Sequence, residues 1–194
     1  MRIQDKLISL RNKRGFTLVE LMIVVAIIGV LAALAIYGVR KYLTNAKSAE
    51  ARTSIGRIAK DSQVAYEREN MNSAVLDLKD TVDIAHTLCP AGAKIPALDA
   101  DVQNKKYQSD PGEWNGAGWS CLKFSMSDPQ YFQYEFSSDG TGAEDAVFEA
   151  LAHGDLDGDG TMSTFGLGGK IQKGTSGELV LTLAPTIRED AAEE

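Results

Sequence analysis

One apolar segment near the amino terminus constrains the fold of this 194-residue chain more than any other feature. The 22 residues from Phe16 to Tyr37 carry a single charge, that of Glu20. As an α-helix, at about 1.5 Å per residue, they would extend roughly 33 Å, enough to cross the ~30 Å hydrocarbon core of a bilayer. The segment therefore predicts a membrane-spanning helix, and the rest of the chain has to fold outside it.

The residues before this segment are basic. Positions 1–15 hold five Lys or Arg and one Asp, a net charge of +4, whereas only Arg40 and Lys41 follow shortly after the segment. By the positive-inside rule, this bias places the amino terminus in the cytoplasm and the remainder outside. The pattern is typical of a plain single-span anchor and of a secretory signal peptide, for which Ala33–Ala35 would be the A-x-A cleavage motif.

Glu20 counts against both of these interpretations. A carboxylate inside an apolar membrane segment costs about 2 to 3 kcal/mol and usually has a functional reason. The run GFTLVELMIVVAIIG at 15–29 closely resembles the amino-terminal signature of type IV pilins and type II secretion pseudopilins. The resemblance is strong from Lys13 to Glu50 and looser beyond.

The resemblance implies that residues 1–15 are a leader peptide. In this family a prepilin peptidase cuts after the glycine, here Gly15, and methylates the amine of the new terminal residue, here Phe16. The mature chain would keep 179 of the 194 residues, and loss of the +4 leader would change the net side-chain charge from −7 to −11. Glu20 would then lie in the first helical turn, and in a fibre it would pair with the Phe16 amine of a neighbouring subunit.

We divide the precursor's long helix at the membrane boundary. Residues 16–37 would be its membrane and assembly half, and residues 38–72 an amphipathic half whose Ile55, Ile58 and Tyr66 share a stripe that packs on a globular head. Many family members have a proline where this chain has Tyr37, so the resemblance predicts a straighter stem here.

The remainder predicts a sheet-containing head. Residues 73–120 have the composition of a loop region, and residues 121–194 that of an antiparallel sheet. Alternating patterns and turn residues predict strands at 121–126, 131–136, 146–153 and 177–183. The fold class is therefore α+β, with a long amino-terminal helix packed on a C-terminal antiparallel sheet, which is the pilin fold that the resemblance implies.

Cys89 and Cys121 are the two cysteines of the chain. In a protein exported to an oxidising space they are most simply one disulfide, and two buried free thiols are the alternative. No CxxC spacing favours catalysis or metal binding by these cysteines.

The acidic turn at 155–161 resembles the first half of a calcium loop. Its ligands would be Asp155, Asp157, Asp159 and the backbone carbonyl of Thr161. The closing glutamate is missing because Gly166 occupies the twelfth position, and Asp139 or Glu178 would have to supply an outside ligand. Some pilins and pseudopilins use an acidic loop for calcium, but a plain Asp/Gly turn explains the same residues. Calcium is thus the one cofactor that the sequence suggests, and both interpretations stay open.

The sequence favours a structural protein over an enzyme. His86 and His153 lie far apart in sequence, and there is neither a nucleophile elbow nor a phosphate loop. The net charge of −7 is unfavourable to broad phosphate-backbone binding, so no sequence-specific nucleic-acid partner is expected.

The resemblance implies a type IV pilus subunit that polymerises into a surface fibre for motility, adhesion or DNA uptake. Its partners would be copies of itself, the prepilin peptidase, and the pilus assembly platform with its ATPase motor. It would span the inner membrane once before assembly and become extracellular afterwards. The alternatives are a type II secretion pseudopilin, whose major forms typically have shorter heads without a disulfide, and a secreted binding domain released after Ala35.

Overall fold

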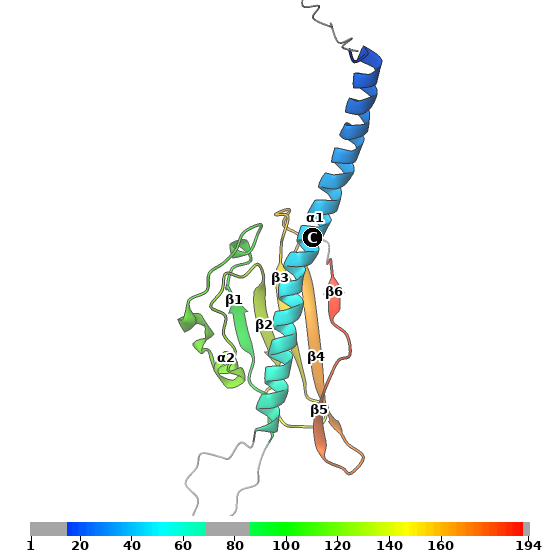
Figure 1. Cartoon of the computed structure of the whole chain (residues 1–194). Helices are drawn as coiled ribbons and strands as arrows, with labels where there is room; N and C mark the ends of the chain where they lie inside the picture. The colour runs from blue at the N-terminus through cyan, green and yellow to red at the C-terminus, as the bar shows by residue number, and fades with distance from the viewer. Residues whose placement is uncertain (1–14, 69–85, 192–194) are drawn as a thin grey trace, which may run out of the picture. The chain divides into compact units, whose positions relative to one another are not determined.

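The structure is a computed structural model that describes residues 15–68 and 86–191 of the chain (Figure 1). The chain forms two compact units, Met1–Lys41 and Tyr42–Glu194. Most of the expected leader, at positions 1–14, and the end of the expected helix, at positions 69–72, lie outside the described residues.

Helix α1 (Leu18–Glu67) confirms the prediction of one long amino-terminal helix. It continues through Tyr37 and through its three glycines without interruption. The sequence has no proline before Pro90, so nothing in α1 removes a backbone donor or clashes with the preceding turn.

A six-stranded antiparallel sheet occupies the second unit. Its strands are β1 (Gly92–Ile95), β2 (Gln133–Ser138), β3 (Val147–Gly154), β4 (Ser163–Lys173), β5 (Leu179–Leu183) and β6 (Arg188–Asp190). The spatial order is β1-β2-β3-β4-β5, and β6 pairs with the part of β4 that β5 leaves free. Strands consecutive in sequence are neighbours from β1 to β5. Short connections join β2 to β5, whereas the connection from β1 to β2, residues 96–132, contains α2 (Ala117–Leu122).

The second half of α1 packs on one face of this sheet (Figure 1). The buried helix residues recur at helical spacing, and the strand residues that meet them are aromatic or small. The shared core includes Ile55, Ile58, Ala59 and Tyr66 of α1 with Tyr134, Phe136, Phe148, Ala150, Ala152, Phe165 and Ile171 of the sheet. The apolar stripe predicted for the stem is thus confirmed as the sheet-facing side of α1.

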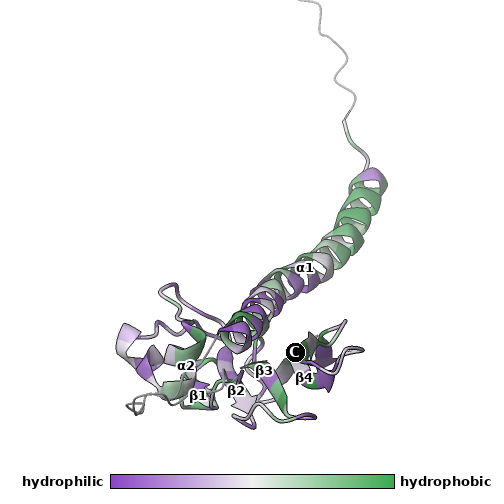
Figure 2. Ribbon diagram, turned by 90° about the horizontal axis from the view of Figure 1, so that it is seen from below, coloured by the Kyte–Doolittle hydropathy of each residue, from purple (hydrophilic) through white to green (hydrophobic). Residues whose placement is uncertain are grey.

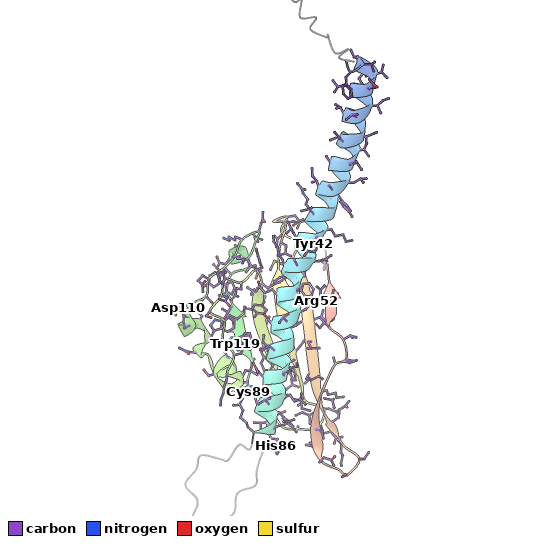
Figure 3. The ribbon with its side chains drawn as sticks, in the orientation of Figure 1. Tyr42, Arg52, His86, Cys89, Asp110 and Trp119 are labelled. Atoms are coloured by element: carbon purple, nitrogen blue, oxygen red, sulfur yellow. A yellow bond between two sulfur atoms is a disulfide. The ribbon has the colours of Figure 1, made fainter. Side chains whose placement is uncertain are left out.

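Polar contacts also fix α1 to the sheet. Glu50 Oε1 accepts hydrogen bonds from the Tyr131 backbone N–H at 2.9 Å and from the Tyr134 hydroxyl at 3.2 Å. Burial raises the pKa of the Glu50 carboxyl above its ordinary value. Arg52, labelled in Figure 3, binds Glu189 of β6 through two bonds, Nε–Oε1 at 2.7 Å and Nη2–Oε2 at 3.0 Å. This ion pair joins residues 137 positions apart in sequence.

Cys89 and Cys121 form a disulfide, as predicted, with their Cα atoms 5.7 Å apart. The bond attaches helix α2 (Ala117–Leu122) to the segment that leads into β1. Trp119 of the same helix (Figure 3) meets Trp114 edge-on, with ring centroids 5.0 Å apart, and its Nε1–H donates to Ala93 O at 2.9 Å. The disulfide and the tryptophans therefore hold α2 against the β1 side of the sheet.

Loss of the disulfide is expected to destabilise the head substantially. The disulfide closes a loop of 32 positions and so lowers the entropy of the unfolded chain. In the chain-entropy model, this stabilises the folded state by about 3 to 4 kcal/mol. The double variant Cys89→Ser/Cys121→Ser should lose that much free energy of unfolding in denaturant titrations of the detergent-solubilised chain. The reduced wild-type chain serves as the control and should unfold like the variant. Two alkylatable thiols in the native exported protein would contradict the assignment.

The strand predicted at 121–126 is wrong. Its first residues end α2, and Lys123 adopts the left-handed conformation, with φ of 60°, that terminates the helix. The backbone N–H of Phe124 then bonds back to Trp119 O at 3.2 Å. Burial of Trp119, which is only 1% exposed, stabilises this helical turn over the local strand pattern.

The expected loop region 73–120 is also more ordered than predicted in its described part. It contains β1, two 3-10 helices at Asp99–Asp101 and Pro111–Asn115, and most of α2. The second 3-10 helix begins with a capping box, in which Asp110 Oδ1 accepts from Gly112 N–H and Glu113 accepts from Asp110 N–H, both at 2.7 Å.

Strand β4 was not predicted; it contains three glycines, at 166, 168 and 169, and glycine is unfavourable inside a strand. Packing requires glycine at position 169. A Cβ there would lie 2.4 Å from the Phe148 ring, so only glycine lets the two strands and this aromatic side chain fit together. Strand β6 escaped prediction for another reason, since its three residues are polar and exposed.

Candidate processing and assembly site

The expected cleavage site lies in a non-helical segment just before α1. Residues 15–17 have no regular secondary structure. A Cβ placed on Gly15 would meet nothing within 4 Å, and Phe16 is 85% exposed. The bond between them is therefore accessible backbone of the kind that proteases cut.

Thr17 and Glu20 close the first turn of α1 as a capping box. Thr17 Oγ1 accepts a bond from the Glu20 backbone N–H at 3.3 Å. In return Glu20 Oε2 accepts from the Thr17 backbone N–H at 2.9 Å and from its hydroxyl at 2.8 Å. These bonds satisfy donors that the first turn of a helix leaves free, and the carboxylate lies where the helix dipole favours negative charge.

The part played by Thr17 was not predicted. The T-x-x-E spacing at 17–20 is the sequence signal of a capping box. Glu20 therefore has a hydrogen-bond partner within its own chain, namely the backbone and hydroxyl of Thr17.

The surface of α1 in the first unit is apolar, as the hydropathy colouring of Figure 2 shows. Its large apolar side chains are exposed, from 46% at Val24 to 74% at Leu18. Among the described residues, α1 is the one helix long and apolar enough to cross a membrane, and none of its most apolar 18-residue window is buried. Such a surface requires lipid or other apolar helices to cover it.

The three aspartates of the acidic turn converge. One carboxylate oxygen from each of Asp155, Asp157 and Asp159 lies within 4.8 Å of the others. Gly158 and Gly160 have φ of 84° and 93°, which the sharp turn needs and glycine permits. Both carboxylate oxygens of the buried Asp155 accept backbone N–H groups from these glycines, at 2.6 and 2.9 Å. Hydrogen bonds within the turn thus maintain its shape without an ion.

The other calcium ligands expected from the sequence are Thr161 and either Asp139 or Glu178. Thr161, whose carbonyl was expected to bind the ion, donates its N–H to Asp159 Oδ1 at 2.6 Å. Neither Asp139 nor Glu178 belongs to the aspartate group, and Asp139 instead accepts the Val147 N–H at 2.9 Å. Calcium binding at 155–161 stays a prediction.

Calcium is expected to bind this turn weakly. Three close carboxylates repel one another and a divalent cation relieves that repulsion, but without a bidentate glutamate the dissociation constant should be about 0.1 to 1 mM. The melting temperature of the detergent-solubilised chain should rise in millimolar calcium relative to chelator, and Asp157→Ala should abolish the rise. Asp128→Ala, an exposed aspartate outside the turn, is the control. Identical melting with calcium and chelator would leave a plain Asp/Gly turn.

Comparisons with known proteins match these features. Residues 10–36 fit the family model for the prokaryotic N-terminal methylation motif. The type IV major pilin protein PilA of Myxococcus xanthus is 60% identical over 44 residues, which cover 23% of this chain and 20% of PilA. The type IV major fimbrial protein FimA of Dichelobacter nodosus is 34% identical over 101 residues, covering 52% of this chain and 58% of FimA. These matches span less than two thirds of either relative.

A longer match is to the type II secretion system core protein G of Pseudomonas aeruginosa. It is 31% identical over 131 residues, covering 68% of this chain and 78% of that protein. No solved structure matches the chain significantly. With the methylation motif, the long apolar helix and a relative aligned over most of its length, the chain belongs to the family of type IV pilins and type II secretion pseudopilins.

Proposed function

We propose that this chain is the structural subunit of a type IV pilus and polymerises through α1 into a surface fibre. The observation that carries the proposal is the exposed apolar half of α1, with one carboxylate in its first turn. A single chain cannot bury that surface. A membrane covers it before assembly, and the helices of neighbouring copies cover it in a fibre. The protein would thus act by assembly and not by catalysis.

Processing by a prepilin peptidase would prepare the chain for assembly. The enzyme would cut between Gly15 and Phe16 and methylate the new amine, and the accessibility of this bond supports the proposal. Before assembly the chain would span the inner membrane once, with its head outside. The assembly platform and its ATPase motor would then extract it into an extracellular fibre used for motility, adhesion or DNA uptake.

Glu20 would direct the incoming subunit. Its carboxylate is held at the start of α1 by Thr17, close in sequence to the cleaved terminus. In apolar surroundings an unpaired carboxylate is costly, and the amine of a second subunit would neutralise it. Extraction from lipid into the fibre would therefore be favoured by the exchange of a bond within the chain for an ion pair between chains.

The second candidate function is that of a type II secretion pseudopilin, whose periplasmic fibre pushes substrates outward. The long match to core protein G favours it. The disulfide and the segment 86–132, which contains β1 and α2, favour a pilin, because major pseudopilins typically have shorter heads without a disulfide.

Mass spectrometry and electron microscopy of the cells of origin test these proposals together. A pilin should be recovered from sheared surface filaments as a chain that begins at Phe16 and carries one added methyl group. A pseudopilin should have the same amino terminus but should be missing from sheared filaments, and its deletion should block protein secretion. A mature chain that begins at Ile36 would overturn both candidates.

A further inference from the structure

Strand β6 (Arg188–Asp190) differs from the other strands in the contacts that attach it to the sheet. All three of its residues are exposed. Each of the other five described strands buries at least one apolar side chain, from Ile95 of β1 to Leu181 of β5. Strand β6 also pairs with β4 over three residues only, at 164–166 (Figure 1). Hydrophobic burial therefore contributes little to the docking of β6, and charged groups supply its side-chain contacts.

Ion pairs hold β6 from both faces of the sheet. Arg188 and Glu189 are neighbours on the strand, so their side chains point to opposite faces. On the α1 face, Glu189 accepts two bonds from Arg52 of α1, at 2.7 and 3.0 Å. The Arg52 guanidinium also lies 5.2 Å from the ring centroid of Phe165, the β4 residue in register with Glu189. The ring and the carboxylate together position Arg52 beside β6.

On the opposite face, Arg188 reaches across β4 to β3. Its Nη2 and Nε donate to Glu149 Oε1 at 2.9 and 3.3 Å, and its Nη1 binds Asp190 of the same strand. The pair of Arg188 and Glu149 lies over Gly166 of β4. A Cβ at position 166 would be 2.5 Å from Glu149 Oε1 and 3.2 Å from Arg188 Nη2. Glycine at this position therefore leaves free the space that the ion pair occupies.

These ion pairs are exposed enough for salt to screen them. The side chains of Arg52, Glu149, Arg188 and Glu189 are 34 to 52% exposed. Exposed pairs contribute little individually, and their attraction decreases as the Debye length falls from about 30 Å at 0.01 M salt to about 3 Å at 1 M. We propose that β6 is a salt-sensitive strap: its ion pairs hold it on β4 at low ionic strength, and at high ionic strength it dissociates while the rest of the head stays folded.

The chain before β6 permits such a local opening. Ile187 packs against the apolar core, and the Ala184 N–H donates to Gly168 O at 2.8 Å, so the connection from β5 stays attached when β6 dissociates. Strand β4 keeps its pairing with β3 along residues 163–170. Only the β4 edge at 164–166 is then uncovered, and its backbone N–H and C=O groups become available to another strand. Segments with few buried contacts are the ones that open in this way.

Hydrogen–deuterium exchange of the full chain in non-ionic detergent micelles tests the proposal at about 0.01 M and 1 M sodium chloride. Rates are normalised to those of the unfolded chain at the same salt. The β6 amides should exchange at least about tenfold faster at the higher salt, whereas the β5 amides at 179–183, which also pair with β4, should be unchanged. Exchange of β6 that does not depend on salt would overturn the strap. Equal acceleration of β5 would also overturn it, because the sheet would then loosen as a whole.

Gly166→Ala tests the ion pair over β4 without removing a charge. The added methyl group would displace the flexible ends of Glu149 and Arg188, so β6 should already exchange about tenfold faster at low salt and respond little to more salt. Gly168→Ala is the matched control on the same strand, because its Cβ would meet only Phe148 O, at 3.4 Å. Neither glycine has a positive φ, so both positions accept alanine.

Arg188→Gln and Arg52→Gln remove one partner on each face and should each release β6 at low salt. Arg57→Gln is their control, because Arg57 pairs with Asp61 along α1, at 3.7 Å, and does not contact β6. Wild-type protection of β6 in Gly166→Ala, Arg188→Gln and Arg52→Gln would show that backbone pairing alone holds the strand, and the strap would be ruled out. The two exposed arginines keep the test decisive even where Gly166→Ala fails to fold.

Discussion

Gly15→Val is expected to leave the 194-residue precursor uncut in the membrane and to abolish fibres. Gly15 lies in non-helical backbone, with open space where a Cβ would be placed. The fold therefore tolerates valine here, and the expected effect is on the peptidase alone. A β-branched side chain next to the scissile bond restricts the backbone and crowds the enzyme, so cleavage should fall below detection. Intact mass of the membrane fraction and electron microscopy of sheared filaments measure the two outcomes.

Gly29→Ala provides the matched control for this experiment. A methyl group added at Gly29 would also meet nothing within 4 Å, but this residue lies inside α1, where alanine favours the helix by about 1 kcal/mol. The variant should be processed like the wild type. A product of Gly15→Val that has lost residues 1–15 would show that cleavage does not require glycine at this position, and the steric argument for Gly15 would have to be abandoned. A wild-type chain that keeps residues 1–15 in the filaments would rule out the processing site itself.

Glu20→Ala is expected to be cleaved and yet to form few fibres. It removes both the capping box with Thr17 and the charge proposed to receive the Phe16 amine of the next subunit. Loss of one partner from a buried charge pair costs about 2 to 5 kcal/mol. Fibre yield, measured as sheared subunit per cell, should therefore fall at least about tenfold while the processed subunit accumulates in the membrane.

Glu20→Gln separates these two roles of the side chain. Glutamine at the third helical position also completes a capping box, so it keeps the start of α1 while removing the charge. We expect Glu20→Gln to assemble as poorly as Glu20→Ala. Wild-type fibre yield in Glu20→Gln would mean that Glu20 acts only as a helix cap, and the proposed ion pair between subunits would be ruled out.

The sequence predicted the parts of this fold that depend on strong periodic patterns. The apolar run from Phe16 and the absence of proline suffice to predict α1, because both features act locally along the helix. Strands β2 and β3 were predicted from alternating residues, since each buries one face on α1. The disulfide was predicted from two cysteines and an oxidising compartment, without knowledge of the geometry.

The features that escaped prediction depend on contacts between distant residues. Residues 121–126 alternate like a strand, but burial of Trp119 extends a helix into them. Position 169 of β4 has to be glycine because the Phe148 ring of β3 occupies the space that a side chain there would need. The row of Gln133, His153 and Thr164 across the sheet could not be predicted either, because these residues meet only through the register of three strands. Thr17 is the exception, because its capping motif is local and detectable from the sequence.

The ion pair between Arg52 and Glu189 bears on the order in which the head matures during translocation. If the head is translocated as proposed, the residues next to the membrane segment emerge first, so Arg52 would precede Glu189, which lies 137 positions later. Cys89 and Cys121 are only 32 positions apart, so oxidation could close that loop before β6 emerges. Until β6 arrives, the edge of β4 near Phe165 has no strand to pair with and is a template for mispairing with other chains. Strand β6, which follows the other five strands in sequence, would thus complete the sheet, and contact order makes its docking a late step in maturation.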